Sequence, residues 1–538
     1  MTAHATSPDT VLAHRRGRWH TRTRSGRRPP FLLIVIAALT ALVTLIPFVY
    51  LVDRAIELGW ANVRAELFQK RTLDLLLRSL ALTGSVTFLC VVIGVSAAWL
   101  VVRADVPGRR VWQVLLILPL AVPSYAAAYA WVSWRPSMAG FGAATLVLTI
   151  VSYPYVFLPV AAALYRLDSA QEEVARSLGW RPWSVLLRLT LRQVHPAITA
   201  GALLVALYVL SDFGAVATMR YEVFTWVIYG AYEAGFNPSR AAILALALIA
   251  VALVLVMGEA RVRGSAAFSR IGSGAPRPQS LMRLGRLRPI ALGFLMLVVG
   301  LGIAFPAWRF VYWIGEAFRV STPIAEVFAA LRQSLWFATL AALVTIVLAV
   351  PIGILAARYR TRTVMAVERS TYVAHALPGI VIGITLVFVG VRLLRPIYQE
   401  TPLLVLAYVV LFLPLAVGSV RSSVEQSPVR LEEVARSLGS TPRRVLTRVT
   451  LPLAAPGLAA GAALVFVATM KELPATLLLH PTGTDTLATR MWSFTSTTNY
   501  AAAAPYAAAL VLFTAVPTAL LSRFLLDRAT GHSDVVQH

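Results

Sequence analysis

The chain is poor in charged residues, which make up only 14% of its 538 residues, whereas 58% are apolar. Soluble domains usually carry roughly a quarter charged residues. A mean hydropathy of +0.72 over this length requires a non-aqueous environment for most of the chain. The composition therefore excludes an ordinary soluble protein and indicates an integral membrane protein.

Cysteine is almost absent, because Cys90 is the only one and it lies within an apolar run. One cysteine excludes a disulfide within the chain and offers no thiol cluster to a metal. The eight histidines are scattered, and no H-E-x-x-H pattern occurs. We therefore predict no cofactor, no metal site and no catalytic residue, and a polytopic membrane enzyme is disfavoured.

Lysine is also scarce, with only Lys70 and Lys471 in the whole chain. A phosphate-binding P-loop needs the pattern G-x-x-x-x-G-K-[ST], because its lysine contacts the phosphates. The two lysines follow Gln69 and Met470, so neither fits that pattern. If the chain uses ATP, a separate subunit must hydrolyse it.

Long apolar runs are abundant. A helix needs about 20 mostly apolar residues to cross the bilayer core. Twelve segments satisfy this and predict an all-α polytopic membrane protein: 31–52, 79–102, 111–133, 141–164, 196–218, 239–258, 290–314, 334–357, 371–394, 402–420, 453–473 and 503–526. The first run is too long for a cleaved signal peptide, so we expect a retained helix.

Arginines orient these predicted spans, because cytoplasmic loops carry the excess of basic residues. The N-terminal tail and the loops 103–110, 165–195, 259–289, 358–369 and 421–452 are basic, whereas 134–140 and 219–238 hold only Arg135 and Arg220. Both termini are therefore expected in the cytoplasm of a cell-membrane protein. The net charge of +25 is a topology signal and does not indicate nucleic-acid binding.

The chain repeats itself at an offset of 260 residues. The octapeptide EEVARSLG occupies 172–179 and again 432–439, and Pro154, Pro196 and Gly201 recur at the same offset. We expect a basic tail (1–30), a first repeat (31–258), a linker (259–289), a second repeat (290–526) and a C-terminal tail (527–538). Six spans in each repeat give two parallel repeats about an axis normal to the membrane.

The two octapeptides lie in loops expected outside the membrane, between the fourth and fifth spans of each repeat. Each predicts a short helix that ends at a glycine, Gly179 or Gly439, and restarts at a proline. Valine and leucine four residues apart share one helix face. Such an apolar edge suits docking into another protein. A single loop of this kind would favour an amphipathic interfacial helix, but two equivalent copies favour docking.

These loops resemble the signature loop of binding-protein-dependent ABC importer permeases, E-V-A-x-x-x-G followed by an apolar-x-Leu-Pro. The second copy continues with Val449, Leu451 and Pro452, whereas the first has Arg192 at the proline position. The resemblance implies that each loop is a coupling helix for one of two ATP-binding cassette subunits, and it implies an extracytoplasmic substrate-binding protein as a further partner. The implied coupling residues are Glu173, Val174, Ala175, Gly179, Glu433, Val434, Ala435 and Gly439.

The fused twelve-span form, with LSDFGA at 210–215 and KELPATLLL at 471–479, is most similar to ferric-iron permeases. Thiamine permeases are the nearest alternative, and a permease for another small solute also stays open. A secondary transporter driven by an ion gradient is disfavoured, because such proteins need ionisable residues at mid-membrane. The spans here are nearly free of charge.

Asp212 and Glu472 are the acidic exceptions, besides a few basic residues such as Arg309 that we expect near helix ends, and the two match at the 260-residue offset near the end of the fifth span of each repeat. Ionisable residues at membrane depth usually face a cavity or a partner. Carboxylate oxygens suit a hard cation such as ferric iron. We predict that both residues line the external part of the pathway. The alternative is that they are helix-end residues that reach water, with Lys471 as local charge balance.

Overall fold

The computed structural model describes residues 29–167, 170–233, 238–263, 281–319, 323–359, 361–375 and 377–530. Within these ranges the chain is helical, apart from turns and one isolated backbone bridge between Ala104 and Met282. The described part thus confirms the predicted all-α class.

The helices of the first repeat follow the predicted spans, with short helices between them. They are α1 (Phe31–Leu58), α2 (Trp60–Leu67), α3 (Lys70–Arg103), α4 (Arg109–Ile117), α5 (Ser124–Trp134), α6 (Gly140–Ser152), α7 (Pro154–Arg166), α8 (Ala170–Ser177), α9 (Pro182–Val185), α10 (Leu191–Ser211), α11 (Gly214–Thr218), α12 (Phe224–Glu233) and α13 (Pro238–Arg263). A π-helical turn, Leu186–Thr190, joins α9 to α10.

The second repeat has a similar succession of elements, in which one helix, α19, stands where the first repeat has α6 and α7. Its helices are α14 (Arg288–Val299), α15 (Phe305–Arg319), α16 (Ile324–Arg358), α17 (Arg362–His375), α18 (Gly379–Arg392), α19 (Thr401–Gln426), α20 (Val429–Ser437), α21 (Pro442–Val445), α22 (Leu451–Lys471), α23 (Pro474–Leu479), α24 (Leu487–Ser496) and α25 (Tyr500–Thr530). A π-helical turn, Leu446–Thr450, joins α21 to α22 at the place equivalent to the first.

Ten helices of the described chain are long and apolar enough to cross a membrane, or 11 if the bent pair that ends in α5 counts as one span. The predicted span 111–133 is that pair, which bends by 90° between Ala121 and Ser124. Val122 is extended there because it precedes Pro123. The predicted span 371–394 is likewise divided before α18, which starts after Pro378.

The predicted span 196–218 is also too long as one helix, because α10 ends at Ser211 and α11 begins only at Gly214. The corresponding break in the second repeat separates α22 from α23 at Glu472. Both predicted pathway carboxylates therefore lie at a helix break. The prediction of twelve segments located the apolar elements but missed the breaks inside them.

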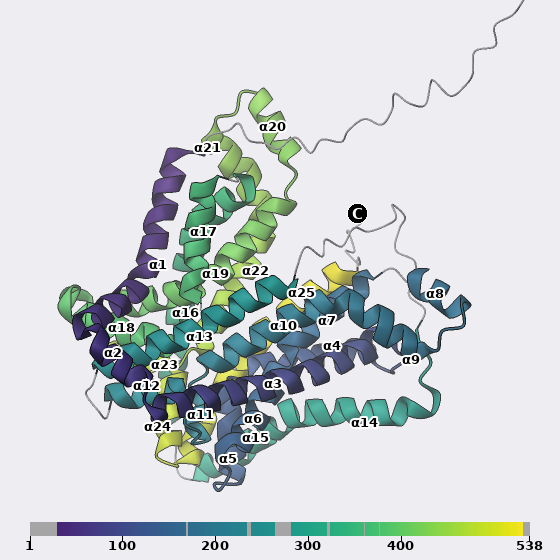
Figure 1. Cartoon of the computed structure of the whole chain (residues 1–538), viewed down its shortest axis with the longest axis horizontal. Helices are drawn as coiled ribbons and strands as arrows, with labels where there is room; N and C mark the ends of the chain where they lie inside the picture. The colour runs from purple at the N-terminus through teal and green to yellow at the C-terminus, as the bar shows by residue number, and fades with distance from the viewer. Residues whose placement is uncertain are drawn as a thin grey trace, which may run out of the picture.

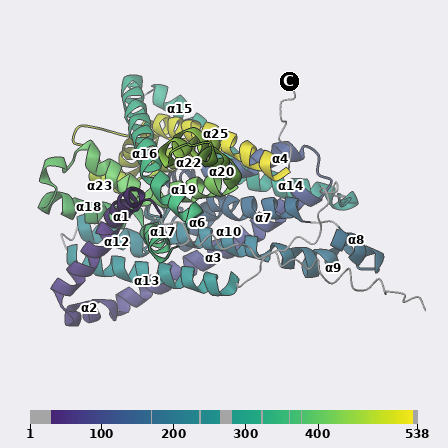
Figure 2. The same ribbon diagram turned by 90° about the horizontal axis from the view of Figure 1, so that it is seen from above.

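The two repeats form two arms that diverge from a common base (Figures 1 and 2). One arm holds α3, α4, α7 and α10 and has α8 near its tip. The other holds α16, α17, α19 and α22 and has α20 and α21 at its tip. The short elements α5, α11, α12, α18, α23 and α24 lie toward the base. The fold therefore separates the two octapeptide loops from each other and keeps both far from the helix breaks.

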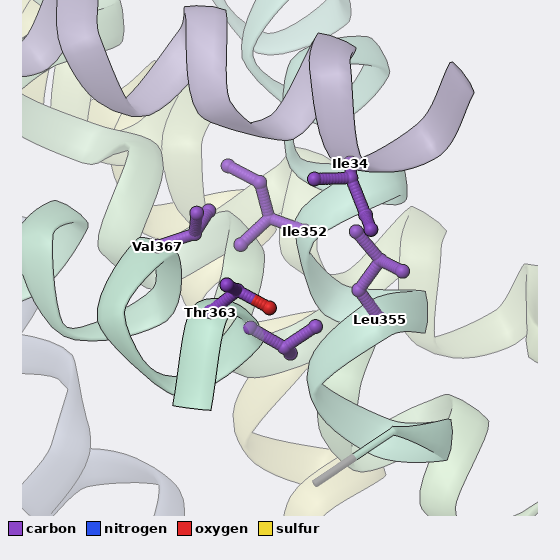
Figure 3. A pocket seen from close by; sticks show the side chains of 6 residues that line it. Ile34, Ile352, Leu355, Thr363 and Val367 are labelled. Carbon is purple, nitrogen blue, oxygen red and sulfur yellow. The ribbon is translucent and has the colours of Figure 1, made fainter. Parts of the chain in front are cut away.

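The first helix of each repeat packs against the other repeat. Helix α1 contacts α16, α17 and α18, while α14 and α15 contact α4 and α5. Figure 3 shows Ile34 of α1 facing Ile352 and Leu355 of α16 across a small crevice. The crevice has a free volume of about 10 Å³ and an almost entirely apolar lining, so it holds at most one water molecule. The first helix of each repeat therefore holds the two repeats together through its contacts with the other repeat.

Small residues allow close helix crossings within each arm. A Cβ on Gly94 of α3 would lie 2.8 Å from Val156 Cβ of α7, and one on Gly353 of α16 would lie 2.6 Å from Val420 Cγ1 of α19. In a bilayer, such close approach favours association of helices because it improves their van der Waals packing. Each arm is therefore a tightly packed unit.

Part of the predicted organisation lies outside the described residues. This applies to the tail up to residue 28, to linker residues 264–280 and to the end of the chain from residue 531. Helix α13 continues to Arg263, beyond the predicted repeat boundary at 258. After the undescribed part of the linker, Met282 donates to Arg103 O and Asp105 donates to Met282 O, which secures the linker against the end of α3.

Candidate functional site

Each octapeptide forms a short helix that ends at its glycine. Gly179 has φ +83° and Gly439 has φ +82°, the left-handed conformation that favours glycine. Trp180 N then donates to Ala175 O at 3.1 Å, and Ser440 N donates to Ala435 O at 3.0 Å. These bonds satisfy carbonyls at the helix end and turn the chain toward α9 or α21. The predicted helix–turn–helix is present in both repeats.

The predicted apolar edge is exposed in both short helices. Leu178 is 73% exposed and Leu438 is 79% exposed, and Val174 and Val434 are exposed beside them. The predicted coupling residues Glu173 and Glu433 are also exposed. Ala175 is buried and Ala435 is half-buried, so the alanines belong to the inner face of the helix.

The neighbouring glutamate, Glu172, has a different role, because it is buried between three elements. Thr190 Oγ1 donates to Glu172 Oε1 at 2.9 Å. Arg103 Nη2, at the end of α3, lies 3.4 Å from the same oxygen, and Arg176 Nη2 lies 3.6 Å from Oε2. One carboxylate thus joins α8 to the end of α3 and to the turn before α10.

Glu432 makes the same connections in the second repeat. Arg358, the last residue of α16, donates to Glu432 Oε1 from Nε at 3.1 Å and from Nη2 at 2.8 Å. Thr450 Oγ1 donates to this oxygen at 3.2 Å, and Arg436 Nη2 donates to Oε2 at 3.3 Å. Arg358 Nη2 also donates to Ser427 O at 3.2 Å. We call these two groups the first and second glutamate clusters.

Sequence reasoning missed both glutamate clusters. It selected the second glutamate of each EEVARSLG octapeptide, whereas the buried one is the first. A signal was available, because Glu172 and Arg176 are four residues apart, as are Glu432 and Arg436. The long-range partners Arg103 and Arg358 could not be found this way, since only the fold brings them to the loops.

Asp212 lies at the end of α10 that is farthest from α8. Its Oδ1 accepts from Ala215 N at 3.0 Å. Thr225 Oγ1 donates to the Asp212 carbonyl at 2.6 Å. The residue is only 8% exposed.

Glu472 occupies the equivalent break in the second repeat and is 9% exposed. Its Oε1 accepts from Ala475 N at 3.1 Å, and its Oε2 accepts from Thr476 N at 3.0 Å and from Thr476 Oγ1 at 2.9 Å. A Cβ on Gly379, at the start of α18, would overlap Glu472 Oε1. Both carboxylates therefore sit where α11 or α23 starts, against the start of α5 or α18.

Tyr125 lies between these two regions. Its ring packs against Gly214, where an added Cβ would lie 2.6 Å from Tyr125 Cβ, and it interacts electrostatically with Glu472. The Tyr125 hydroxyl is buried and has no hydrogen-bond partner. One tyrosine of the first repeat thus connects the surroundings of both carboxylates.

Lys471 does not balance the charge of Glu472 directly, although the two are adjacent in sequence. Its Nζ donates instead to Leu120 O at 2.7 Å, across the boundary between the repeats. Thr514 Oγ1 of α25 donates to Ala121 O at 2.7 Å. The bend before Pro123 interrupts the helical hydrogen bonds, and the second repeat supplies donors to two carbonyls there.

No group of three or more His, Cys, Asp and Glu side chains with a metal-holding arrangement occurs among the described residues. Asp212 and Glu472 are bound to backbone N–H groups at their helix starts. Both carboxylates cap the short helix that follows them. Each therefore places a negative charge, shared with the N–H groups that it accepts, at its helix break.

Comparison with known proteins identifies the family. Residues 90–259 and 349–527 each match the model of the binding-protein-dependent transport system inner membrane component. The chain belongs to this family. It is an ABC importer permease that carries two copies of the permease domain in one polypeptide.

The permease has relatives of two sizes. It is 36% identical to the Fe(3+)-transport system permease protein FbpB 2 of Haemophilus influenzae over 501 residues, which is 93% of this chain and 99% of the relative. It is 30% identical to the molybdenum transport system permease protein ModB of Mycobacterium tuberculosis over 39% of this chain and 86% of the relative.

The sulfate transport system permease protein CysW of Escherichia coli matches over a similar fraction. It is 25% identical over 36% of this chain and 72% of the relative. The FbpB-type relative therefore has the length of the whole permease, whereas the ModB and CysW relatives match a segment shorter than half of it. This difference agrees with the duplication predicted from the sequence.

Proposed function

We propose that the permease imports ferric iron, which it receives from a substrate-binding protein and releases into the cytoplasm. The observation that carries this proposal is the full-length similarity to a relative named for Fe(3+) transport. The relatives named for molybdenum and sulfate transport match over less than half of the chain. Ferric iron is also compatible with carboxylates at the helix breaks, because oxygen ligands suit hard cations.

Two ATP-binding cassette subunits dock on the two octapeptide loops in this proposal. The exposed pairs Val174 with Leu178 and Val434 with Leu438 provide equivalent apolar edges. Glu173 and Glu433 lie beside these edges and pair with basic groups of the ATP-binding subunits. The turns at Gly179 and Gly439 hold each edge away from its arm. The ATP-binding subunits supply the energy.

The octapeptide loops and both termini are cytoplasmic in this proposal, because the basic residues gather on that side. A single cysteine, Ser440→Cys in a Cys90→Ser background, tests the orientation. It should resist an impermeant thiol reagent in intact cells and react after the membrane is opened. Rapid labelling in intact cells would reverse the orientation.

Asp212 and Glu472 line the external part of the pathway, close to the axis that relates the repeats. Their position at the ends of α10 and α22 away from the octapeptide loops supports this. Tyr125, which packs against the break beside Asp212 and interacts with Glu472, supports a shared region between them. Each carboxylate already accepts backbone N–H groups, which suits passing a cation onward better than binding it tightly.

Uptake of radiolabelled ferric iron tests the substrate. The permease is reconstituted with its ATP-binding subunits and binding protein, and thiamine, molybdate and sulfate are offered in parallel. We expect ATP-dependent uptake of ferric iron and none of the other three. Uptake of one of those solutes without iron uptake would overturn the iron proposal and leave the permease assignment intact.

A further inference from the structure

The two glutamate clusters share features that the docking proposal does not use. In each, one buried carboxylate binds an arginine at the end of the second long helix, a threonine in a π-helical turn and an arginine of its own short helix. Each cluster thus consists of one glutamate, two arginines and one threonine. Glu172, Arg176 and Thr190 recur at the 260-residue offset as Glu432, Arg436 and Thr450.

We propose that Glu172 and Glu432 are positioning residues that fix each short helix to its arm and thereby couple ATP hydrolysis to transport. This inference rests on the proposed docking of ATP-binding subunits at α8 and α20. The glutamates act through Arg103 and Arg358 and through the two threonines, and they do not touch the ATP-binding subunits.

Opposite faces of α20 carry the proposed docking role and the proposed positioning role. Glu432 points into the arm and is 4% exposed, whereas Val434 and Leu438 form the exposed edge. A partner that covers the edge therefore leaves the glutamate cluster inside the permease. The same division holds in α8 between Glu172 and the edge of Val174 and Leu178. Force on the edge reaches the arm through the buried carboxylate.

A direct mechanical connection leads from each glutamate cluster to a pathway carboxylate. Thr450 ends the π-helical turn, and α22 starts at the next residue and runs to Lys471, immediately before Glu472. A helix of 21 residues at 1.5 Å each is about 30 Å long, and α22 is continuous over this length. The route from Thr190 along α10 to Asp212 is the same.

The π-helical turns place a weak point next to each glutamate cluster. Such turns are rare, interrupt the regular i→i−4 hydrogen bonds of an α-helix and are frequently found at functional sites. Without the Glu432–Thr450 bond, α20 could move while α22 stayed in place, because the turn between them would absorb the displacement. The carboxylate bridges the flexible joint and makes the short helix and the long helix move together.

Glu432→Gln is the principal test, because the amide keeps the size of the side chain but loses the charge that pairs Arg358 with Arg436. The full complex is placed in lipid vesicles, and ferric iron imported per ATP hydrolysed is measured with the binding protein present. We expect this ratio to fall by about tenfold or more, since Arg358 and Arg436 both lose the counter-charge of the buried carboxylate. The ATP-binding subunits should still co-purify.

Three further variants make the result specific. Thr450→Val removes only the hydroxyl donor and should lower the ratio severalfold even if Glu432→Gln fails to reach the membrane. Glu368→Gln is the matched control, because Glu368 forms an ion pair with Arg421 between α17 and α19, away from α20. It should leave the ratio unchanged. Arg358→Met combined with Glu432→Gln should be no worse than the worse single variant.

If the second glutamate cluster only stabilised the fold, its variants would lower ATP hydrolysis and iron uptake together. The number of iron ions imported per ATP hydrolysed would then stay unchanged. An unchanged ratio in both Glu432→Gln and Thr450→Val therefore overturns the inference. The docking proposal is tested separately by Val434→Ser with Leu438→Ser, which should release the ATP-binding subunits. If those subunits stay bound, the docking proposal fails. If they are released but the ratio in the glutamate cluster variants is normal, only the positioning inference fails.

Discussion

The two glutamate clusters have the same composition but are not equally strong. In the second, Arg358 donates twice to Glu432 and once to Ser427 O. In the first, Arg103 lies at 3.4 Å from Glu172, and its Nε and Nη2 have no hydrogen-bond partner. The first cluster instead has the linker beside it. Met282 N donates a hydrogen bond to Arg103 O, and Met282 O accepts one from Asp105 N.

The two repeats therefore support their glutamate clusters with two different sets of contacts. Side-chain bonds from Arg358 secure the second short helix, whereas in the first repeat the end of α3, which carries Arg103, gains a backbone bridge from the linker. No equivalent bridge is found in the described part of the second repeat. Leu284 N also donates to Asp105 Oδ1 at 2.8 Å, so the linker holds the end of α3 at a side chain as well.

The turns at Gly179 and Gly439 are the feature in which the repeats agree best, and we expect the largest effects there. Gly179→Leu and Gly439→Leu should each reduce uptake at least about tenfold, because a side chain at positive φ costs about 1–2 kcal/mol and shifts the docking edge. Uptake is measured at equal membrane level. Gly84→Leu, on an exposed part of α3, is the control. Normal uptake by either turn variant would contradict the shared role.

The pathway carboxylates test whether the repeats contribute equally to translocation. Glu472→Gln should reduce uptake by about tenfold, because both its oxygens accept backbone N–H groups and the amide nitrogen must then face a donor. Asp212→Asn should reduce uptake less, and the double variant should be at least as defective as Glu472→Gln. ATP hydrolysis stimulated by substrate should persist. Normal uptake by the double variant would remove both residues from the pathway.

Lys471 is where the repeats differ most, since Ser211 stands at the equivalent position and bonds only Tyr208 O in its own helix. Lys471→Met should reduce uptake severalfold, because Leu120 O loses its donor across the boundary between the repeats. Ser211→Ala is the matched control and should transport normally. Equal results for both variants would show that the contact between the repeats is dispensable.

The smallest effect is expected at Trp180, which is exposed beside the first docking edge where the second repeat has Ser440. Trp180→Ser should weaken binding of an ATP-binding subunit by about fivefold, or roughly 1 kcal/mol, because a tryptophan often contributes strongly to an interface. Ser440→Trp should strengthen binding at the second loop. Binding to the permease in lipid discs measures both. An unchanged affinity of the Trp180→Ser variant would show that Trp180 adds nothing to binding at the first edge.

The sequence by itself determined the class of fold, the duplication and the two helix–turn–helix loops. These properties are local, because apolar length, the 260-residue offset and the glycine turns are each visible in a short stretch of chain. The same is true of the pathway candidates, since charged residues in apolar segments are conspicuous. The 90° bend before Ser124 and the start of α18 after Pro378 became visible only in the structure.

Only the tertiary structure decided which glutamate of each octapeptide is buried and which basic residues it meets. Arg103 and Glu172 are far apart in sequence, and one helical period does not tell which face of a short amphipathic helix meets its arm. The exchange of α1 and α14 between the repeats is likewise a matter of packing. Residues distant in the chain meet only where whole helices cross, and that geometry is set by the bundle and not by any local pattern.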